Sequence, residues 1–506
     1  MRDECPGTTG AEPQARKVRV LVRRYEAGRS WYQEYEVAYT PPATVLDVLR
    51  AIADGQDPSL AFRYSCSMGK CGSCGVMVNG EPALSCQRLV EEGEILLEPL
   101  PNSRVVKDLM VERRYEEKLA PILRTEPPFP VVPPRPPDDP TWPECVECLV
   151  CDSACPVVGE VQEQFLGPAL LAGTAGFRKA SLPREWESAY YCLTCGECMA
   201  VCPSGVKPNE TALEVRAAAT REGRLPLPLQ QLGHNVITAH NIRGEESKAR
   251  TLWREGAPAL PTAQRTKALY FVGCVSSLFP SVYEIPQHFA ALLERSGEDI
   301  SLLEGEEWCC GYPLFLNGML DEARELARHN LQTVREAGIC QLVTTCPSCY
   351  YMWREQYPRL LGGETGLEVI HSTQWLLGLL VAGRLRPREL PLRVTYHDPC
   401  DLGRRSGMYE EPRQVLAAIP GVVLVEMRRN RQHALCCGGG GNLETFSPEV
   451  SAAIAQERIR EALETEAEAL VTACPQCQRT LKAAAKALGV RLRVLDVAEL
   501  VWRALG

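Results

Sequence analysis

Cysteine spacing constrains this chain of 506 residues more than any other feature, because most of its 24 cysteines recur at short fixed intervals. The segment Met1–Arg16 lacks the apolar stretch behind basic residues that a secretory signal requires. We therefore expect a reducing cytosol, where thiols rarely form a disulfide framework and more often bind metal. The positions of the cysteines then decide which metal and how many sites.

The first group of cysteines lies between residues 66 and 86, with spacings of four, two and eleven residues. This is the plant-type spacing of a [2Fe-2S] cluster. Neighbouring glycines let the backbone wrap closely round sulfur, and Asn79-Gly80 predicts a tight hairpin turn that returns the last cysteine to the others. A zinc site is the alternative, since it needs only four thiolates. The expected ligands are Cys66, Cys71, Cys74 and Cys86.

Residues 145–203 contain two copies of one run, Cys-x2-Cys-x2-Cys-x3-Cys-Pro. The run is typical of two-cluster bacterial ferredoxins, in which the fourth cysteine of each run binds the other cluster. Two structural zinc sites are the alternative, although so compact a run is poorly spaced for one tetrahedral zinc. We expect one [4Fe-4S] cluster on Cys145, Cys148, Cys151 and Cys202, and another on Cys155, Cys192, Cys195 and Cys198.

The C-terminal half is an internal repeat in which five cysteines recur in register. Each copy holds a single cysteine, an adjacent pair followed by glycine, and then Cys-Pro-x-Cys. Adjacent thiols can bridge neighbouring irons, which favours a polynuclear iron site; zinc in either copy is the alternative. The expected ligands are Cys274, Cys309, Cys310, Cys346 and Cys349 in the first copy, and Cys400, Cys436, Cys437, Cys474 and Cys477 in the second.

A few conspicuous residues stay outside these groups. Cys5 and Cys340 are interpreted as non-ligands, and His371 and His397 as hydrogen-bonded structural residues. The run Gly438–Gly441 lacks the context of a nucleotide-binding loop and follows a cysteine pair, so we interpret it as backbone of a metal site. No dinucleotide fingerprint appears, which predicts that this chain holds no flavin.

Hydrophobic periodicity predicts a multidomain α+β and α/β protein. Alternation over 18–22 and 35–39 indicates a hairpin of two strands, and helices are expected over 44–53, 105–123, 321–337 and 448–463. Short apolar strands at 268–272 and 392–396 lead into the first cysteine of each repeat. The expected organisation is a disordered tail (1–16), a [2Fe-2S] domain (17–108), a helix and proline-rich linker (109–143), a helical two-[4Fe-4S] domain (144–224), a connector (225–265) and two cysteine-rich domains (266–385 and 386–506).

Charge and hydropathy exclude several classes of partner. The net charge is −9 and no basic block occurs, which argues against nucleic acid. The longest charge-free stretch, Leu225–Ile242, is too polar to span a membrane. Apolar residues at Trp375–Ala382 favour a buried helix over a segment touching a membrane surface. We expect a cytoplasmic protein, with a peripheral position at the inner face of the membrane as the alternative.

The motifs resemble those of known electron-transfer subunits. Residues 18–224, including Ser67-Met-Gly-Lys-Cys-Gly-Ser-Cys and Val105-Val-Lys-Asp-Leu, resemble the iron-sulfur subunit of succinate dehydrogenase and fumarate reductase. Residues 267–506 are similar to the heterodisulfide reductase subunit whose two modules carry the same Cys-Cys-Gly (CCG) pattern. The fusion of both resembles the iron-sulfur subunit of the thiol-driven (CoM/CoB) fumarate reductases. Cys195 fills a position that quinone-linked members lack, which favours a second [4Fe-4S] cluster over an ordinary quinone site.

The resemblance implies a β-grasp fold for the [2Fe-2S] domain, one or two noncubane [4Fe-4S] clusters in the CCG domains, and FAD on a partner flavoprotein. It implies electron relay between that FAD and a thiol/disulfide couple. One alternative is an iron-sulfur subunit of a quinone-linked succinate dehydrogenase, with the CCG domains as anchor and acceptor. Another is the iron-sulfur subunit of a glycolate-type 2-hydroxy acid oxidase, although such subunits generally lack a [2Fe-2S] domain.

Overall fold

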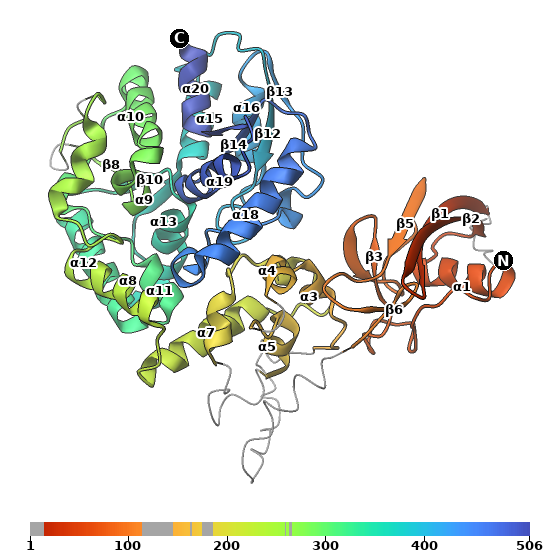
Figure 1. Ribbon diagram of the computed structural model, residues 1–506. Coiled ribbons are helices and arrows are strands. Elements are labelled where there is room, and N and C mark those ends of the chain that lie inside the picture. The colour runs from red at the N-terminus through yellow and green to blue at the C-terminus, as the bar shows by residue number, and fades with distance from the viewer. Residues whose placement is uncertain (1–14, 114–144, 162–163, 175–185, 259, 263–265) are drawn as a thin grey trace, which may run out of the picture. The chain divides into compact units, whose positions relative to one another are not determined.

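The protein is described by a computed structural model over residues 15–113, 145–161, 164–174, 186–258, 260–262 and 266–506 (Figure 1). The chain forms two compact units, each described by itself below. The first unit comprises Met1–Gly159, Gly167–Gly176 and Val201–Val206, and the second comprises Glu160–Leu166, Phe177–Ala200 and Lys207–Gly506. The expected disordered tail and most of the proline-rich linker lie outside the described residues.

The first unit contains a mixed five-stranded sheet in the order β2-β1-β5-β3-β4. The predicted hairpin is present, and its alternate valines are buried on one face together with the apolar side of helix α1. Thr44 caps α1, accepting a hydrogen bond from the Asp47 amide while the Asp47 carboxylate accepts from Thr44. The elements are β1 (Arg16–Glu26), β2 (Arg29–Tyr39), α1 (Val45–Gly55), β3 (Gly75–Val78), β4 (Glu81–Leu84) and β5 (Glu94–Glu98).

The prediction of a helix over 105–123 is wrong for residues 105–113, the part that the structure describes. These residues form the strands β6 (Val105–Lys107) and β7 (Met110–Val111). Asp108 turns the chain between them with a positive φ of 47°. Its carboxylate is fully buried, accepts hydrogen bonds from the amides of Tyr25 and Ala61, and pairs with Arg24. These tertiary bonds outweigh the local helical pattern, which sequence periodicity alone cannot reveal.

Short helices surround the cysteines of the two-cluster region. The first unit contains α3 (Val150–Ala154) and α5 (Pro168–Thr174), and α4 (Pro156–Glu160) ends at the boundary between the units. In the second unit, the 3-10 helix η2 (Trp186–Tyr191) is followed by α6 (Glu197–Ala200), α7 (Pro208–Arg221), α8 (Leu227–Thr238) and η3 (Ser247–Arg254).

Two parallel sheets of the second unit show the duplication directly. The first has the order β11-β10-β8-β9 and the second has β13-β12-β14-β15, which is the same arrangement once equivalent strands are matched. The predicted helices of the two repeats appear as α12 and α18. The first repeat contains β8 (Ala268–Phe271), α9 (Cys274–Leu278), η4 (Pro280–Val282), α10 (Glu284–Ser296), β9 (Ile300–Ser301), η5 (Glu304–Glu306), α11 (Tyr312–Asn317), α12 (Leu320–Glu336), β10 (Gln341–Thr344), α13 (Pro347–Tyr351), η6 (Met352–Gln356), α14 (Tyr357–Leu361), β11 (Glu368–His371) and α15 (Ser372–Val381).

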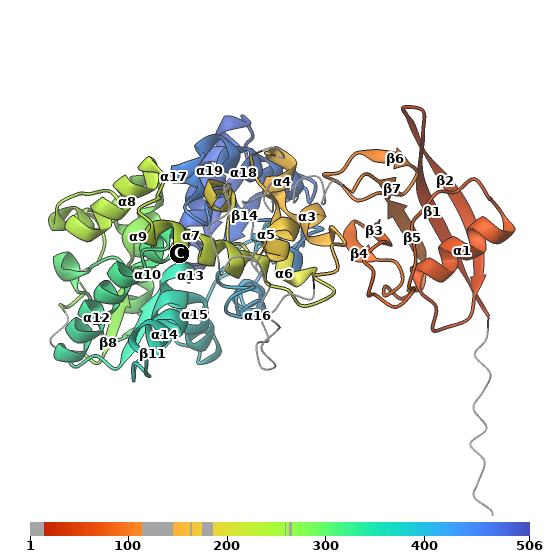
Figure 2. The same ribbon diagram turned by 90° about the horizontal axis from the view of Figure 1, so that it is seen from below.

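The second repeat packs against the first through one shared hydrophobic core. Helices α10 and α15 of the first repeat contact α20 of the second (Figure 1), and α15 also contacts α16 (Figure 2). Burial of these faces joins both repeats into one body. The second repeat contains β12 (Leu392–His397), α16 (Glu410–Ala417), β13 (Val422–Leu424), η7 (Arg431–His433), α17 (Leu443–Phe446), α18 (Pro448–Leu463), β14 (Ala469–Thr472), α19 (Pro475–Ala487), β15 (Arg493–Asp496) and α20 (Val497–Leu505).

Gly438 offers a test of how tightly the second repeat holds its cysteine pair. Its φ is +82°, and an added Cβ would lie 2.3 Å from the Ser451 carbonyl oxygen. We expect Gly438→Ala to lower the free energy of unfolding by about 3 kcal/mol or more, because the strain of the left-handed conformation adds to this clash. Gly489 is a matched control, since its φ is +67° and nothing lies within 4 Å of its Cβ position.

Gly489→Ala should cost only about 1 kcal/mol, the penalty of the backbone conformation. Urea unfolding followed by circular dichroism compares the two variants, and the iron content of each shows whether the second repeat keeps its metal. Equal losses of stability would contradict the packing described for Gly438.

Candidate metal centres

The loop between α1 and β3 carries Cys66, Cys71 and Cys74, and Cys86, which follows β4, completes the four thiols predicted for the [2Fe-2S] cluster. The Cys66 sulfur accepts hydrogen bonds from the amides of Met68 at 3.4 Å and Lys70 at 3.3 Å, and the sulfurs of Cys74 and Cys86 lie 3.3 Å apart. The Cys66 amide and the Ser73 hydroxyl lower the pKa of Cys71 to about 6. Amides directed at sulfur and a thiol that ionises near neutral pH fit a bound iron-sulfur cluster.

The first [4Fe-4S] run lies directly against this loop in the same unit. A Cβ on Gly72 would fall 2.0 Å from the Val146 carbonyl oxygen, and one on Gly75 would fall 3.0 Å from that of Cys148. Side chains at these two positions would therefore separate the loops. Burial and, to a smaller extent, the nearby charge of Cys202 raise the pKa of Cys148 to about 11. Cys202 thus lies with its predicted co-ligands, and Cys151 is buried beside them in α3.

The second [4Fe-4S] run is divided between the two units. Cys192, Cys195 and Cys198 belong to the second unit, whereas Cys155 belongs to the first. The Cys192 sulfur accepts a hydrogen bond from the Thr194 amide at 3.3 Å. Completion of this site by Cys155 stays a prediction.

Both CCG sites arrange their five thiols in the same order of contact. The single cysteine contacts the first member of the pair, the pair is adjacent, and its second member contacts the last cysteine of Cys-Pro-x-Cys. The chains of contact are Cys274–Cys309–Cys310–Cys349–Cys346 and Cys400–Cys436–Cys437–Cys477–Cys474.

The sheets explain why these thiols converge. The single cysteine follows the first strand of each repeat, and Cys-Pro-x-Cys follows the next strand, so both lie at the carboxyl end of a parallel sheet. Hydrogen bonds from both neighbouring thiols lower the pKa of Cys310 to about 6 and that of Cys437 to about 5. Each site therefore supplies a ready thiolate at its centre, which fits a bridging metal ligand.

A cavity of about 380 Å³ lies between the two CCG sites. Most of their cysteines line it, together with the polar residues Ser348, Asp401 and Gln476. The Asp401 carboxylate accepts hydrogen bonds from Tyr312 at 2.9 Å and from Ser348 at 2.7 Å. Both sites thus line one shared cavity rather than separate surfaces.

Arg250 is a partner of the first CCG site that sequence reasoning missed. The side chain is buried, and its Nη2 donates to the Cys274 sulfur at 3.0 Å while Nη1 donates to Glu307 at 3.0 Å. Glu307 in turn accepts hydrogen bonds from the amides of Val272 and Gly273. The arginine lies in the connector before the repeat, where no cysteine spacing marks it.

The second CCG site is joined to the second [4Fe-4S] run within one unit. Hydrogen bonding to Cys436, together with burial, raises the pKa of Cys195, so these two thiols are in contact. The run Gly438–Gly441 packs on the same loop, where a Cβ on Gly441 would lie 2.3 Å from the Cys192 carbonyl oxygen. The prediction that this glycine run is metal-site backbone agrees with that position.

Buried arginines hold this junction together. Arg216 is completely buried, and its guanidinium donates to four carbonyl oxygens, those of Ala189, Cys192, Leu316 and Gly441. Arg404 donates to the Cys195 carbonyl at 3.1 Å and pairs with Glu197. Arg405 donates to the Thr194 carbonyl at 2.7 Å. None of these arginines was predicted, because their partners are distant in sequence.

The structure also places most of the cysteines and histidines that were interpreted as non-ligands. Cys340 is exposed and Cys5 lies outside the described residues. His371 caps α15 by accepting a hydrogen bond from the Thr373 amide, which is a structural role. His397, by contrast, lies beside two thiols of the second CCG site.

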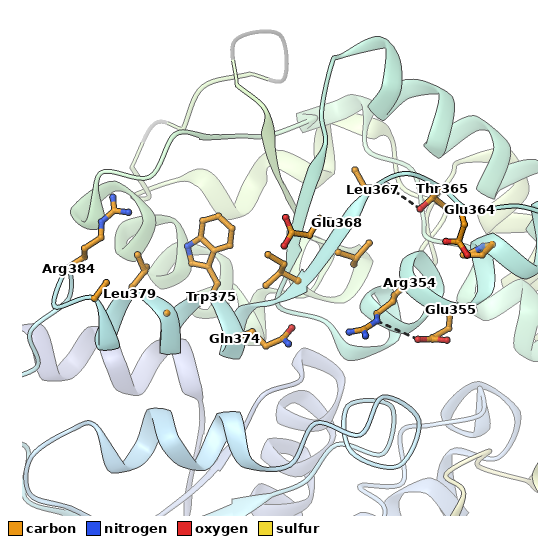
Figure 3. Close-up of a pocket in the computed structure, with 15 residues that line it drawn as sticks. Arg354, Glu355, Glu364, Thr365, Leu367, Glu368, Gln374, Trp375, Leu379 and Arg384 are labelled. Carbon is orange, nitrogen blue, oxygen red and sulfur yellow. Dashed lines mark hydrogen bonds and ion pairs between the residues drawn. The ribbon is translucent and has the colours of Figure 1, made fainter.

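The helix predicted at Trp375–Ala382 is α15, which is partly buried in the shared core. Its outer side borders an open groove of about 780 Å³ beside strand β11. Figure 3 shows Trp375 and Leu379 rising from α15 into this groove, with Glu368 of β11 facing them. None of the cysteines that the structure describes lines this groove, so it is separate from the candidate metal centres.

The domain content of the chain matches this geometry. Residues 18–117 match the 2Fe-2S iron-sulfur cluster binding domain, 142–206 match the 4Fe-4S dicluster domain, and 268–354 and 394–482 both match the Cysteine-rich domain termed CCG. One curated relative, from Methanosarcina barkeri, is a subunit of Dihydromethanophenazine:CoB--CoM heterodisulfide reductase, 34% identical over 67% of this chain and 83% of its own. Another, from Methanothermobacter marburgensis, is a subunit of fumarate reductase (CoM/CoB), 30% identical over 96% of this chain and 98% of its own.

The chain belongs to the family of these two reductase subunits. It is an iron-sulfur electron-transfer subunit, and its relatives are subunits of oxidoreductase complexes. A hypothetical protein from Helicobacter pylori shares the fold, with a TM-score of 0.59 at 12% identity over 97% of this chain and 95% of its own. Among the described residues, no helix is long and apolar enough to cross a membrane.

Cys71 and Cys340 form a matched pair for testing the ligand assignment. We expect Cys71→Ser to remove the [2Fe-2S] cluster, because serine oxygen is a poorer ligand for iron than thiolate, and to leave the other clusters in place. Cys340→Ser should change neither iron content nor the electronic spectrum. Iron analysis and EPR spectroscopy of the reduced proteins measure both, and loss of iron on replacing Cys340 would contradict the assignment.

Arg216→Ala tests the junction in the second unit. The substitution leaves four carbonyl oxygens without their donor, so we expect it to lower the free energy of unfolding by about 3 kcal/mol or more. Arg221 is the control, because it is exposed on the same helix α7 and its replacement by alanine should cost under about 0.5 kcal/mol. Denaturant unfolding of the two variants measures the difference, and similar losses would contradict the bridging role.

Proposed function

We propose that this chain relays electrons between FAD on a partner flavoprotein of the succinate dehydrogenase/fumarate reductase type and a thiol/disulfide couple at the CCG domains. The observation that carries the proposal is the cavity of about 380 Å³ lined by cysteines of both repeats. Two metal centres facing one shared cavity would suit a substrate that exchanges two electrons between them. The names of the two relatives, one from a heterodisulfide reductase and one from a CoM/CoB fumarate reductase, agree with this chemistry.

The order of the sites along the chain supports a path for the electrons. The [2Fe-2S] loop lies against the first [4Fe-4S] run, as the contacts of Gly72 and Gly75 indicate. The second [4Fe-4S] run meets the second CCG site at Cys195 and Cys436. We therefore propose that electrons enter or leave the CCG domains through Cys436, so that the second CCG site is nearer the flavin along the path and the first is the terminal one.

The proposed reaction balances as two coupled half-reactions. Two thiols lose two electrons and two protons as their sulfurs join in a disulfide, and fumarate gains two electrons and two protons at the partner to become succinate. Iron-sulfur clusters would supply one-electron transfer at the CCG cysteines. Around the cavity, Asp401 accepts hydrogen bonds from Tyr312 and Ser348 and pairs with Arg405 at 3.1 Å, and we propose that this carboxylate accepts and passes on the thiol protons.

A quinone-linked function is the second candidate, with the CCG domains as the acceptor module. It is favoured by a more distant relative, the EtfAB:quinone oxidoreductase of Syntrophomonas wolfei, which is 29% identical over 63% of this chain. This chain spans 47% of that relative's length, so the likeness covers only part of it. The open groove beside α15 and β11, which no described cysteine lines, is a separate surface on which such a function could bind a quinone (Figure 3).

Purification of the chain together with its flavoprotein partner tests the proposal. The complex is assayed for fumarate reduction with dithiols and, separately, with menaquinol analogues as electron donor. Thiol-driven reduction is the expected result. Reduction by menaquinol alone would favour the quinone-linked candidate, and a colourless chain containing zinc instead of iron would overturn both.

Asp401→Asn is expected to lower the thiol-driven rate about 100-fold, because an amide does not accept the proton that the carboxylate takes up. The iron content should stay unchanged, since Asp401 is not among the expected ligands. Initial rates across a range of pH, with Cys340→Ser as the control variant, measure the effect. An unchanged rate and pH profile would show that the carboxylate has no part in proton transfer.

A further inference from the structure

His397 ends strand β12 beside the second CCG site. One of its ring nitrogens and the sulfurs of Cys437 and Cys477 all lie within 4.8 Å of one another, and all three residues are buried. In the first repeat the equivalent position, three residues before the single cysteine, is Phe271. The two CCG sites therefore share the same thiol arrangement but differ in whether a nitrogen stands beside it.

A buried arginine determines which nitrogen of this histidine carries the proton. Arg458 Nε donates to His397 Nδ1 over 3.1 Å, and Arg458 Nη1 is held by the Arg429 carbonyl at 2.9 Å and by Glu461 at 2.8 Å. A guanidinium only donates hydrogen bonds, so Nδ1 must accept and must be unprotonated. The ring hydrogen of His397 then sits on Nε2.

This tautomer argues against His397 as a metal ligand. Histidines that bind metal through one nitrogen usually donate a hydrogen bond from the other, which increases the electron density available to the metal. Here the second nitrogen faces a cation and accepts, which withdraws electron density from the ring. Nε2 has no hydrogen-bond partner among the described residues, the two cysteine sulfurs included, so its N–H is left for the cluster that these thiols would hold.

We propose that, with a cluster bound at the second CCG site, His397 donates its Nε2–H to a sulfur of that cluster or of its neighbouring ligands Cys437 and Cys477, and so tunes the cluster without binding its metal. This inference rests on the proposed function, because it requires an iron-sulfur cluster at that site. A hydrogen bond to a thiolate favours the reduced, more negatively charged cluster and so raises its reduction potential. Phe271 supplies no such bond in the first site, where Arg250 donates instead to Cys274 at the other end of the thiol chain.

Redox titration followed by EPR spectroscopy on the full-length chain tests the proposal. His397→Phe, which copies the residue of the first repeat, should shift the one-electron equilibrium of the second CCG cluster about tenfold toward the oxidised state, or about 59 mV. His397→Gln, which keeps an N–H donor, should shift it less. The reduction potential of the first CCG cluster should stay unchanged. His288→Phe is the control, since His288 stacks on Trp502 and does not line the cavity.

Metal analysis and ¹⁵N-histidine labelling separate the possible failures. Full iron content in the variants, with only weak coupling between the cluster and ¹⁵N in the unsubstituted chain, is the expected result. If the His397 variants keep their iron and the reduction potential of the second CCG cluster is unchanged, the role of His397 is overturned but the proposed function is not. Loss of metal in both variants together with strong ¹⁵N coupling would show direct ligation and also overturn it. Zinc at the second site of the unsubstituted chain would instead overturn the proposed function. The ¹⁵N coupling is measured on the unsubstituted chain, so it tests the proposal even if a variant fails to fold.

Discussion

Burial of thiolates is the physical constraint on which the C-terminal half of the chain depends. Each CCG site places its cysteines largely out of contact with bulk water, and an ionised sulfur in such surroundings is costly unless positive charge lies near it. Buried arginines supply that charge at the edges of the sites. They are themselves held by carbonyl oxygens and carboxylates, so removal of one partner would leave an uncompensated charge. The sites and their arginine supports are therefore interdependent.

The duplicated sheets explain how one short motif produces two such sites. Parallel strands end at the same edge, so a cysteine after the first strand and Cys-Pro-x-Cys after the next must converge. The shared core then turns the two edges toward one cavity. The two sites differ in the residues that contact their thiols. Arg250 lies against the first site, whereas His397 and Cys195 lie against the second. The two centres are built alike but are placed in different electrostatic surroundings.

Spacing and periodicity predict the groups of thiols, the hairpin of β1 and β2, and the helices α12 and α18, because these features depend on local sequence. The segment after residue 105 is different, since the buried Asp108 binds amides from distant parts of the chain and overrides the helical pattern. Arg216 and Arg250 were missed for the same reason. His397 had one available signal, namely the exchange of phenylalanine for histidine between otherwise matching repeats, which an alignment of the two copies displays.

The glycine run after the second cysteine pair has a consequence for assembly. Gly440 and Gly441 leave space for the backbone of Leu193 and Cys192, so the loop of the second [4Fe-4S] run fills a place within the second repeat. That loop cannot settle before the repeat has folded, and the repeat is incomplete without the loop. The shapes of the two predicted cluster sites are thereby coupled, because a change that orders one of these loops also constrains the other.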